Sequence, residues 1–280
     1  MMNSEILFNE SSRDYHANPA LSKSKLDDFI KRPSFYALKY IHKEIKEPEN
    51  RNFIVGSATH SLILEGREAF EKEYYLIPVG VGKRTIRDKA AREALALEHP
   101  GKDGIEVDEF EKIKMMQKAI QGNLKASFLV DSCKSKEVTF RASVGGVDLQ
   151  CRPDGYLAGE SGVMVFDLKT TAKFLSDDLK EMEKSILDFN YHIQASFYSS
   201  IITKVTGKKP VDFRFIFVEK NQPHECQVIS LSEEAMDIGN REVFHALERF
   251  KGCQENNLWP GLDDKLKEAS LPAWYVRQYG

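Results

Sequence analysis

Residues 137–170, EVTFRASVGGVDLQCRPDGYLAGESGVMVFDLKT, decide the fold of this chain. Apolar and polar side chains alternate at 137–144, which predicts a β-strand. Two glycines then suit a tight hairpin turn, after which residues 147–156 form the expected partner strand. A further turn leads to the apolar run 163–166, which is typical of a buried strand. We therefore expect three consecutive strands that open a sheet.

The flanking segments predict an α/β core preceded by helices. Periodicity after the third strand indicates a helix, two strands and a final helix, at residues 176–205, 211–219, 225–231 and 232–251. Before the first strand the patterns are helical, at residues 20–46 (divided by Pro33), 51–65 and the second half of 83–122. No strand is expected in that N-terminal part.

The composition suits a globular protein with one core. The chain has 280 residues, of which 41% are hydrophobic and 30% charged, and no apolar run approaches the roughly 20 residues that cross a bilayer. The N-terminal residues lack a signal-peptide pattern and the cysteines lack paired spacing, so we expect a cytoplasmic protein without a membrane partner. We expect a single elaborated domain, residues 1–280, with a helical region at about 15–130 and an α/β core at about 131–255.

The charge balance excludes a purely electrostatic nucleic-acid binder. There are 40 basic and 43 acidic residues, which gives a net charge of −3. Positive charge does gather locally, in residues 23–32 and 83–92, near several tyrosines. Such runs suit tracking of a phosphate backbone, and they also suit a solvated helix face.

Two carboxylates and a lysine stand out on the predicted strands. Asp154 follows Pro153, and Asp167 and Lys169 occupy alternate positions on the next strand, so they share a face. If the strands pair as a hairpin, Asp154 joins them. Such oxygen ligands suit Mg²⁺, which activates water and neutralises charge on phosphorus. The alternative is a surface ion pair between Asp167 and Lys169.

Three further residues are candidates for the same site. His60 follows Gly56 on a predicted helix, and an imidazole can bind Mn²⁺ or Mg²⁺, although such a histidine can also be structural. Gln194 and Tyr198 lie one helical turn apart and so share a face. They could position a phosphate or a base, or they could simply face solvent.

The order of these motifs resembles the PD-(D/E)xK nuclease superfamily in its RecB-like branch. The nearest similarity is to nuclease domains of the RecE (exonuclease VIII) type. The motifs are Gly56-x-x-x-His60, Glu137, Pro153-Asp154, Asp167-x-Lys169 and Gln194-x-x-x-Tyr198, with Tyr15-His16 and Ser22-Lys23-Ser24-Lys25-Leu26 near the start. The resemblance covers roughly residues 15–220.

The resemblance implies a restriction-endonuclease-like core, a mixed sheet flanked by helices. It further implies a Mg²⁺-dependent 5′ to 3′ exodeoxyribonuclease that acts on ends of double-stranded DNA, with Mn²⁺ able to substitute. Such an enzyme needs no ATP, and residues 80–85 fail as a phosphate-binding loop because Arg84 stands where a serine or threonine belongs. The implied assembly is a homo-oligomeric ring that passes its single strand to a RecT-type annealing protein in phage-type homologous recombination.

The resemblance also assigns roles to residues. It implies Lys169 as the water-activating residue, with Gln194 and Tyr198 beside it. Glu137 is either a further ligand or an exposed strand residue. The implied metal ligands are His60, Asp154, Asp167 and the backbone carbonyl of Leu168. Iron–sulfur relatives carry a cysteine where this chain has Arg32, so we expect no iron–sulfur cluster.

A 5′ end must be distinguished by its terminal phosphate. Ser22, Ser24 and Lys25 open a predicted helix whose free N–H groups favour an anion, and Arg152 lies two residues from Asp154. We expect these four residues to form a 5′-phosphate pocket. The alternative is that a serine only caps the helix.

Two other functions stay open from sequence. One is an endonuclease or a helicase-associated nuclease on the same fold. The other is a catalytically silent DNA-binding module, which has no need of a carboxylate pair that repels phosphate unless metal is bound.

Overall fold

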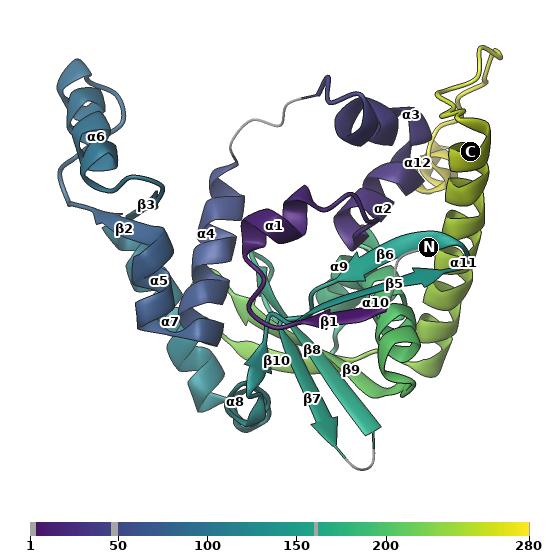
Figure 1. Cartoon of the computed structure of the whole chain (residues 1–280). Coiled ribbons are helices and arrows are strands. Elements are labelled where there is room, and N and C mark those ends of the chain that lie inside the picture. Colours follow the sequence, from purple (N-terminus) through teal and green to yellow (C-terminus); the bar gives the residue numbers. More distant parts are fainter. Residues whose placement is uncertain (1–3, 46–49, 160–161, 280) are drawn as a thin grey trace.

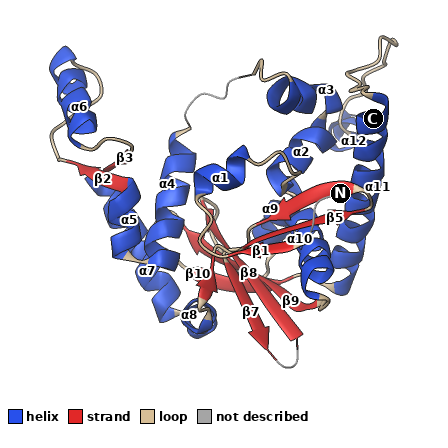
Figure 2. Ribbon diagram, in the orientation of Figure 1, coloured by secondary structure: helices blue, strands red, loops and turns tan. Residues whose placement is uncertain are grey.

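A mixed five-stranded sheet forms the centre of the computed structural model, which describes residues 4–45, 50–159 and 162–279. Its strand order is β10-β9-β8-β7-β4 (Figure 2). β8 and β9 are parallel and the other neighbours antiparallel. The strands are β4 (Ser135–Lys136), β7 (Gly155–Gly159), β8 (Gly162–Thr171), β9 (Pro210–Glu219) and β10 (Cys226–Ser230).

A second sheet corrects one expectation from the sequence. It is antiparallel, in the order β1-β5-β6, with β1 (Glu5–Leu7), β5 (Thr139–Val144) and β6 (Val147–Cys151). The strand predicted at 147–156 is in fact two strands, because β6 ends before Pro153 and β7 begins after it, in the other sheet. Pro153 has no N–H to donate to a ladder, so the chain changes sheets there. Asp154 lies at this change of sheet.

Helices cover both faces of the central sheet (Figure 1). One hydrophobic cluster joins the second sheet to one face of the central sheet and to α2 (Lys23–Lys31), α10 (Tyr191–Thr206) and α11 (Glu233–Asn256). Another covers the opposite face with α4 (Arg51–His60), α7 (Val107–Gly122) and α8 (Leu124–Ser132). The remaining helices are α1 (Ser12–Ala17), α3 (Pro33–Tyr36), α5 (Arg67–Glu73), α6 (Ile86–Glu98), α9 (Lys180–Asp188) and α12 (Ala273–Tyr279), and the π-helical turns are η1 (Ala37–Ile41) and η2 (Ser61–Glu65).

Strand β8 contributes to both clusters. Val165 packs toward α10, whereas Phe166 and Leu168 pack toward α7. Successive side chains of a strand point to opposite faces, so Asp167 and Lys169 face the side of α10. The two clusters thereby determine the face on which the polar residues of β8 lie.

Several helix predictions are confirmed in outline and corrected in detail. The helix expected at 176–205 is two helices, α9 and α10, because Asn190 between them has a φ of 53°, a conformation that asparagine tolerates. The pattern at 51–65 gives α4 followed by η2. The pattern at 20–46 gives α2, α3 and η1, and residue 46 lies outside the described residues.

Helices α10 and α11 approach each other closely at Gly239. A Cβ atom added there would overlap the carbonyl oxygen of His192 and lie 2.5 Å from the hydroxyl of Ser196. Glycine is therefore required for this contact between the helices, since any side chain would push α11 away from α10.

Residues 74–106 form a projection that we call the arm (Figure 1). It consists of α6 and two short parallel strands, β2 (Tyr74–Ile77) and β3 (Asp103–Glu106). β2 and β3 lie in the region expected to be helical, and β1 lies before that region, where no strand was expected either. They were missed because three or four residues are too few to show a period of two.

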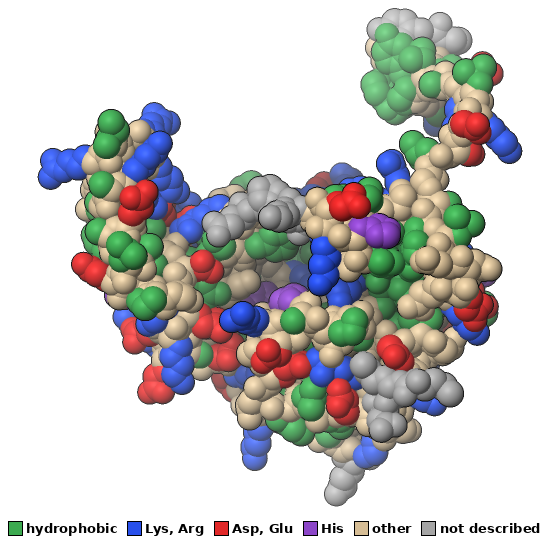
Figure 3. Space-filling model, turned by 45° about the horizontal axis from the view of Figure 1, so that its top comes forward, with side chains coloured by type: hydrophobic (Ala, Val, Ile, Leu, Met, Phe, Trp, Pro, Cys, Tyr) green, Lys and Arg blue, Asp and Glu red, His purple; other side chains and the backbone are tan. Residues whose placement is uncertain are grey.

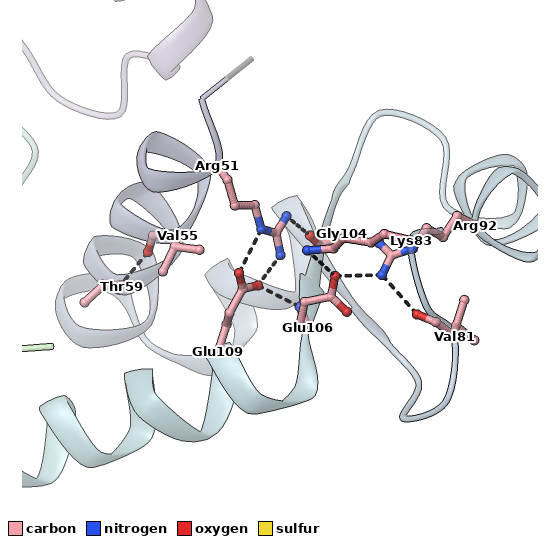
Figure 4. Close-up of polar contacts among 9 residues, drawn as sticks. All are labelled: Arg51, Val55, Thr59, Val81, Lys83, Arg92, Gly104, Glu106 and Glu109. Carbon is pink, nitrogen blue, oxygen red and sulfur yellow. Dashed lines mark hydrogen bonds and ion pairs between the residues drawn. The ribbon is translucent and has the colours of Figure 1, made fainter. Parts of the chain in front are cut away.

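Polar contacts join the arm to the body (Figure 4). Arg51 of α4 donates to the carbonyl oxygen of Gly104 at 2.6 Å, and the N–H of Glu106 donates to Glu109 of α7 at 2.9 Å. Arg51 and Glu109 are themselves paired at 2.9 Å. Within the arm, Glu106 pairs with Lys83 at 3.1 Å and with Arg92 at 2.7 Å. None of the helices in the described ranges is long and apolar enough to span a membrane.

Candidate active site

The two aspartates and the lysine meet where β7 and β8 pair as an antiparallel hairpin, as expected. Gly155 lies opposite Phe166, so Asp154 directly precedes the paired segment. Its Oδ2 accepts a hydrogen bond from the N–H of Leu168 at 2.5 Å. Both carboxylates are buried, with Asp154 5% and Asp167 4% exposed. A surface ion pair is therefore the wrong interpretation of Asp167 and Lys169.

His60 and Glu137 approach Asp154 from other elements. The Nδ1 atom of His60, the last residue of α4, lies 3.2 Å from Oδ1 of Asp154. Glu137 connects β4 to β5 with a φ of 55° and forms an ion pair with Arg152. One ligand atom from each of His60, Glu137 and Asp154 lies within 4.8 Å of the others. We call these three residues the trio; Glu137 is not an exposed strand residue.

Gln194 and Tyr198 also reach the site, from α10. Nε2 of Gln194 donates to Oδ2 of Asp167 at 2.6 Å, while Nζ of Lys169 lies 2.5 Å from Oδ1. Tyr198 is buried against Phe213 and its edge lines the same cavity. The pair does not face solvent. Gln194 holds the Asp167 carboxylate in place through this hydrogen bond. The predicted contact with a phosphate or a base therefore falls to Tyr198, which lines the cavity.

Burial and mutual charge perturb the cationic groups of the site. Burial lowers the pKa of His60, but the charge and hydrogen bond of Asp154 outweigh it and raise the pKa to about 9. Burial likewise lowers the pKa of Lys169, and Asp167 outweighs it, so this pKa is raised. At neutral pH both side chains are therefore protonated. Lys169 can donate hydrogen bonds in this form but cannot accept a proton.

The acidic groups shift in different directions. Burial raises the pKa of Glu137 to about 7, with the charge of Asp154 adding to the effect. Burial also raises the pKa of Asp167, which Lys169 offsets only in part. For Asp154 the positive charges of His60 and Lys169 outweigh burial, and its pKa is lowered. Asp154 is thus the firmly ionised carboxylate among the three.

The donor set of the trio fits a divalent cation. Two carboxylates and an imidazole converge, and hard cations prefer such oxygen-rich ligands, with nitrogen accepted by Mn²⁺. The N–H and C=O of one strand residue point to the same side, so the carbonyl of Leu168 faces Asp154 as its N–H does. Asp167 lies beside the trio, with its oxygens bound to Lys169 and Gln194. Its role as a direct ligand stays a prediction.

His60 and Glu137 of the trio line a cleft of about 1340 Å³, and the buried Asp154 lies next to His60. One wall comes from α1 and α2 and the facing wall from α4 and the base of the arm (Figure 1). Figure 3 shows this hollow, with a histidine side chain inside it and Lys and Arg side chains beside it. A strand of nucleic acid needs such an open, polar channel to reach buried ligands.

The predicted 5′-phosphate residues divide into two groups. Ser22, Ser24 and Arg152 line the cleft. Ser22 is the N-cap residue of α2, but its side chain makes no capping hydrogen bond; its hydroxyl lies 3.2 Å from that of Ser24. Nη1 of Arg152 is buried without a hydrogen-bond partner among the described residues. Simple capping by Ser22 is therefore the wrong interpretation.

Lys25 does not belong to this group. Its Nζ donates to the carbonyl oxygens of Asn18 at 2.5 Å and Ala20 at 3.0 Å, and burial lowers its pKa to about 8. The expectation that Lys25 binds phosphate is corrected: its ammonium group fixes the turn between α1 and α2. Lys23, two residues earlier, lines the cleft instead.

One residue of the site went unrecognised in the sequence. Nζ of Lys169 lies 4.8 Å from the centre of the Tyr191 ring, a cation–π distance. Tyr191 precedes Gln194 by three residues, a spacing that shares a helix face. That spacing was the available signal, but it is visible only once α10 is known to begin at Tyr191.

Comparisons with known proteins agree with this geometry. Residues 22–267 match the model of a family described as "PDDEXK-like domain of unknown function (DUF3799)". The chain is similar in fold to a "putative exonuclease" from Eubacterium rectale, with a TM-score of 0.56 and 17% identity over 96% of this chain and 98% of that chain. A structure of SSO0001 aligns with a TM-score of 0.26 and 13% identity over 69% of this chain and 84% of that chain, and supports no conclusion. No curated protein matches the chain.

Proposed function

This chain belongs to the family of PDDEXK-like domains, and we propose that it is a metal-dependent exodeoxyribonuclease acting on ends of double-stranded DNA in the 5′ to 3′ direction. The predicted fold, a mixed α/β core of the PD-(D/E)xK nuclease type, is confirmed. The assignment to the RecE type stays a prediction. The observation that carries the proposal is the trio, in which His60 and Glu137 are half-buried and Asp154 is buried, next to Asp167 and Lys169 at the floor of an open cleft.

The residues divide the work of phosphodiester hydrolysis. Mg²⁺, or Mn²⁺ in its place, would be held by His60, Glu137 and Asp154. The bound ion would neutralise charge at the phosphate and make a bound water more acidic. Asp167, held by Gln194 and Lys169, is placed to orient the attacking water. Lys169 donates from its ammonium group toward that water or a phosphate oxygen. Tyr198 limits the space beside Asp167.

The decisive experiment compares linear and closed DNA. End-labelled linear duplex should be digested with Mg²⁺ and left intact without it, whereas a covalently closed circle of the same sequence should survive. Cleavage of the circle would favour an endonuclease. A protein that binds both forms and cleaves neither would be a silent DNA-binding module, against which the buried carboxylates argue because they repel phosphate when no cation is bound.

Selection of the 5′ end would use Ser22, Ser24 and Arg152. A terminal phosphate carries more charge than an internal one, and Arg152 offers an Nη1 without a hydrogen-bond partner in the described chain. Duplex with a 5′-phosphate should be digested faster than 5′-hydroxyl duplex, and Ser24→Ala should reduce that preference. Equal rates at both ends by the unmodified protein would contradict the proposal.

We also propose that the chain assembles into a ring. A ring of several copies would let a protomer of net charge −3 stay on long DNA by enclosing it. Light scattering should then return a mass several times 32.0 kDa. We further propose that a RecT-type annealing protein receives the single strand.

A further inference from the structure

An exposed phenylalanine lies in the cleft. Phe189 is 57% exposed and lines the same cavity as His60 and Glu137. It belongs to the short link between α9 and α10. A large aromatic side chain left exposed inside a polar cleft suggests a ligand with an aromatic face.

The Phe189 ring is aligned with the catalytic lysine. Its centre lies 5.6 Å from that of Tyr191 with an interplanar angle of 25°, which is a stacked arrangement. Tyr191 in turn contacts the ammonium group of Lys169 at 4.8 Å. A planar group on the free face of Phe189 would therefore continue a row that begins at Lys169.

The link that carries Phe189 is anchored to α2. Nζ of Lys23 donates to the carbonyl oxygen of Phe189 at 2.8 Å and to Asp27 at 2.6 Å. The side chain of Asn190 donates to the same aspartate at 3.4 Å. These contacts fix the ring as a preformed platform, so a ligand would not have to order it.

We propose that Phe189 is the stacking platform for an unpaired nucleobase of the strand that is cleaved, one step from the scissile phosphate. This inference rests on the proposed nuclease function. A base inside a duplex is covered on both faces by its neighbours, so a base beside an internal phosphate can lie flat on Phe189 only after it has left the stack. A terminal pair has one free face, and opening of that pair before cleavage is therefore part of the proposal, to be tested separately from stacking. Every base has such a face, so the platform tolerates any sequence.

A second exposed aromatic supports a base as the ligand. Phe53 of α4 is 70% exposed and lines the facing wall of the same cleft. Aromatic side chains interleaved with cationic ones, here Lys23 and Arg152, are the pattern of single-strand binding surfaces. An apolar partner helix would instead leave the neighbouring carboxylates and lysines buried without partners.

Binding of a fluorescent base tests the platform directly. The probe is a single-stranded oligonucleotide with 2-aminopurine at its 5′ end, mixed with the full chain and Ca²⁺ in place of Mg²⁺. Stacking should quench the fluorescence, and Phe189→Ala should relieve the quenching and weaken binding about tenfold. Phe189→Tyr keeps an aromatic ring and should behave as the unmodified protein does. The matched control is Phe244→Ala, because Phe244 is 61% exposed on α11, away from the cleft residues.

The outcomes separate this inference from the proposed function. Phe189→Ala with unaltered quenching and affinity would overturn the platform and leave the nuclease untouched. Quenching that depends on Phe189 in a protein that hydrolyses no DNA would support the platform and contradict the nuclease. In turnover assays, Phe189→Ala should lower kcat more on fully paired ends than on ends with a mismatched terminal pair. Equal losses on both substrates would count against opening of the terminal pair.

Discussion

The floor of the cleft and the arm both carry many charges, but they carry them differently. At the floor, Asp154 and Asp167 are almost fully buried and each contacts a cationic side chain. On the arm, Arg84, Arg87 and Lys89 are exposed to solvent. Burial makes each charge at the floor depend on its neighbours, whereas water and salt screen the charges of the arm. Substitutions should therefore have large effects at the floor and small, additive effects on the arm.

The largest effect should follow loss of Asp167 or Lys169. Asp167→Ala and Lys169→Ala should each reduce the hydrolysis rate by about 10²- to 10⁴-fold, because they act on groups that react in a site of low dielectric. Lys89→Ala on the arm is the matched lysine control and should stay within a few-fold of the unmodified protein. Calorimetry with Mn²⁺ adds a second measurement: Lys169→Ala should still bind the ion, since Lys169 is not a ligand. Complete loss of Mn²⁺ binding in that variant would show that the roles are misassigned.

Metal affinity should depend on pH through His60. Its pKa of about 9 means that Mn²⁺ must displace a proton at lower pH, so apparent affinity should rise by up to about tenfold per pH unit between 7.5 and 8.5. Mn²⁺ titrations at both pH values test this. His60→Ala should remove most of the dependence of apparent Mn²⁺ affinity on pH, and its activity should be recovered in part at high Mn²⁺ concentration. A slope unchanged in the variant would exclude His60 as a ligand.

The same histidine should affect the stability of the metal-free protein with a definite sign. Its pKa is raised above the ordinary value of 6.5, so the protonated form stabilises the fold. That contribution is fully present below pH 6.5 and is lost as pH rises through about 9. Urea unfolding at pH 6 and pH 9.5 should show a smaller pH effect in His60→Ala. The free energy of unfolding of His60→Ala should itself fall only moderately, because the half-buried His60 is not part of the hydrophobic core.

At the base of the arm, Glu109→Gln should have a smaller effect. It weakens a paired contact with Arg51 that is partly open to water, worth about 1 kcal/mol. We expect faster proteolytic cleavage within residues 74–106, with little change in the unfolding temperature of the body. The control is Glu111→Gln, because Glu111 lies two residues further along α7 and its side chain is 58% exposed. Global unfolding of the Glu109 variant would mean that the arm and body form one cooperative unit.

The smallest effect should come from neutralising the exposed cations at the start of α6. Replacing Arg84, which precedes the helix, and Arg87 and Lys89, which lie near its start, with glutamine should raise KM by a few-fold at low salt and leave kcat unchanged. The slope of log affinity for DNA against log salt concentration should fall in magnitude by at most about 2.7, since each of the three cations accounts for at most about 0.9 through one phosphate contact. A change in kcat would mean that residues of the arm take part in the hydrolysis step, and the expected difference in effect between the arm and the floor of the cleft would be wrong.

Local patterns in the sequence predicted much of the site. Asp154, Asp167 and Lys169 lie close together as predicted, because strand alternation is a local property that two short motifs can show; their roles stay a prediction. Glu137 was left ambiguous, since its conformation depends on an ion pair with Arg152 and a hydrogen bond to the Asp154 carbonyl, both of which join the β4–β5 connection to the β6–β7 connection. Such contacts leave no period in the sequence.

The same reason explains the mistaken role of Lys25. A lysine at the start of a helix predicts an exposed cation, but the turn before α2 places two carbonyl groups within its reach. The change of sheet at Pro153 was missed for a related reason. The proline was visible, but the existence of a second sheet depends on pairing with β1, more than a hundred residues away in the chain.

The contact at Gly239 has a genetic consequence. Gln194 reaches Asp167 only while α10 keeps its position, and α11 presses on α10 at His192, two residues from Gln194. An allele that changes Gly239 to a larger residue would displace Gln194 and with it the Asp167 carboxylate, without altering any residue of the site itself. A screen for inactive alleles should therefore recover Gly239 together with the acidic residues of the floor. Second-site suppressors of such an allele should map to small residues on the facing side of α10, Ser196 first among them.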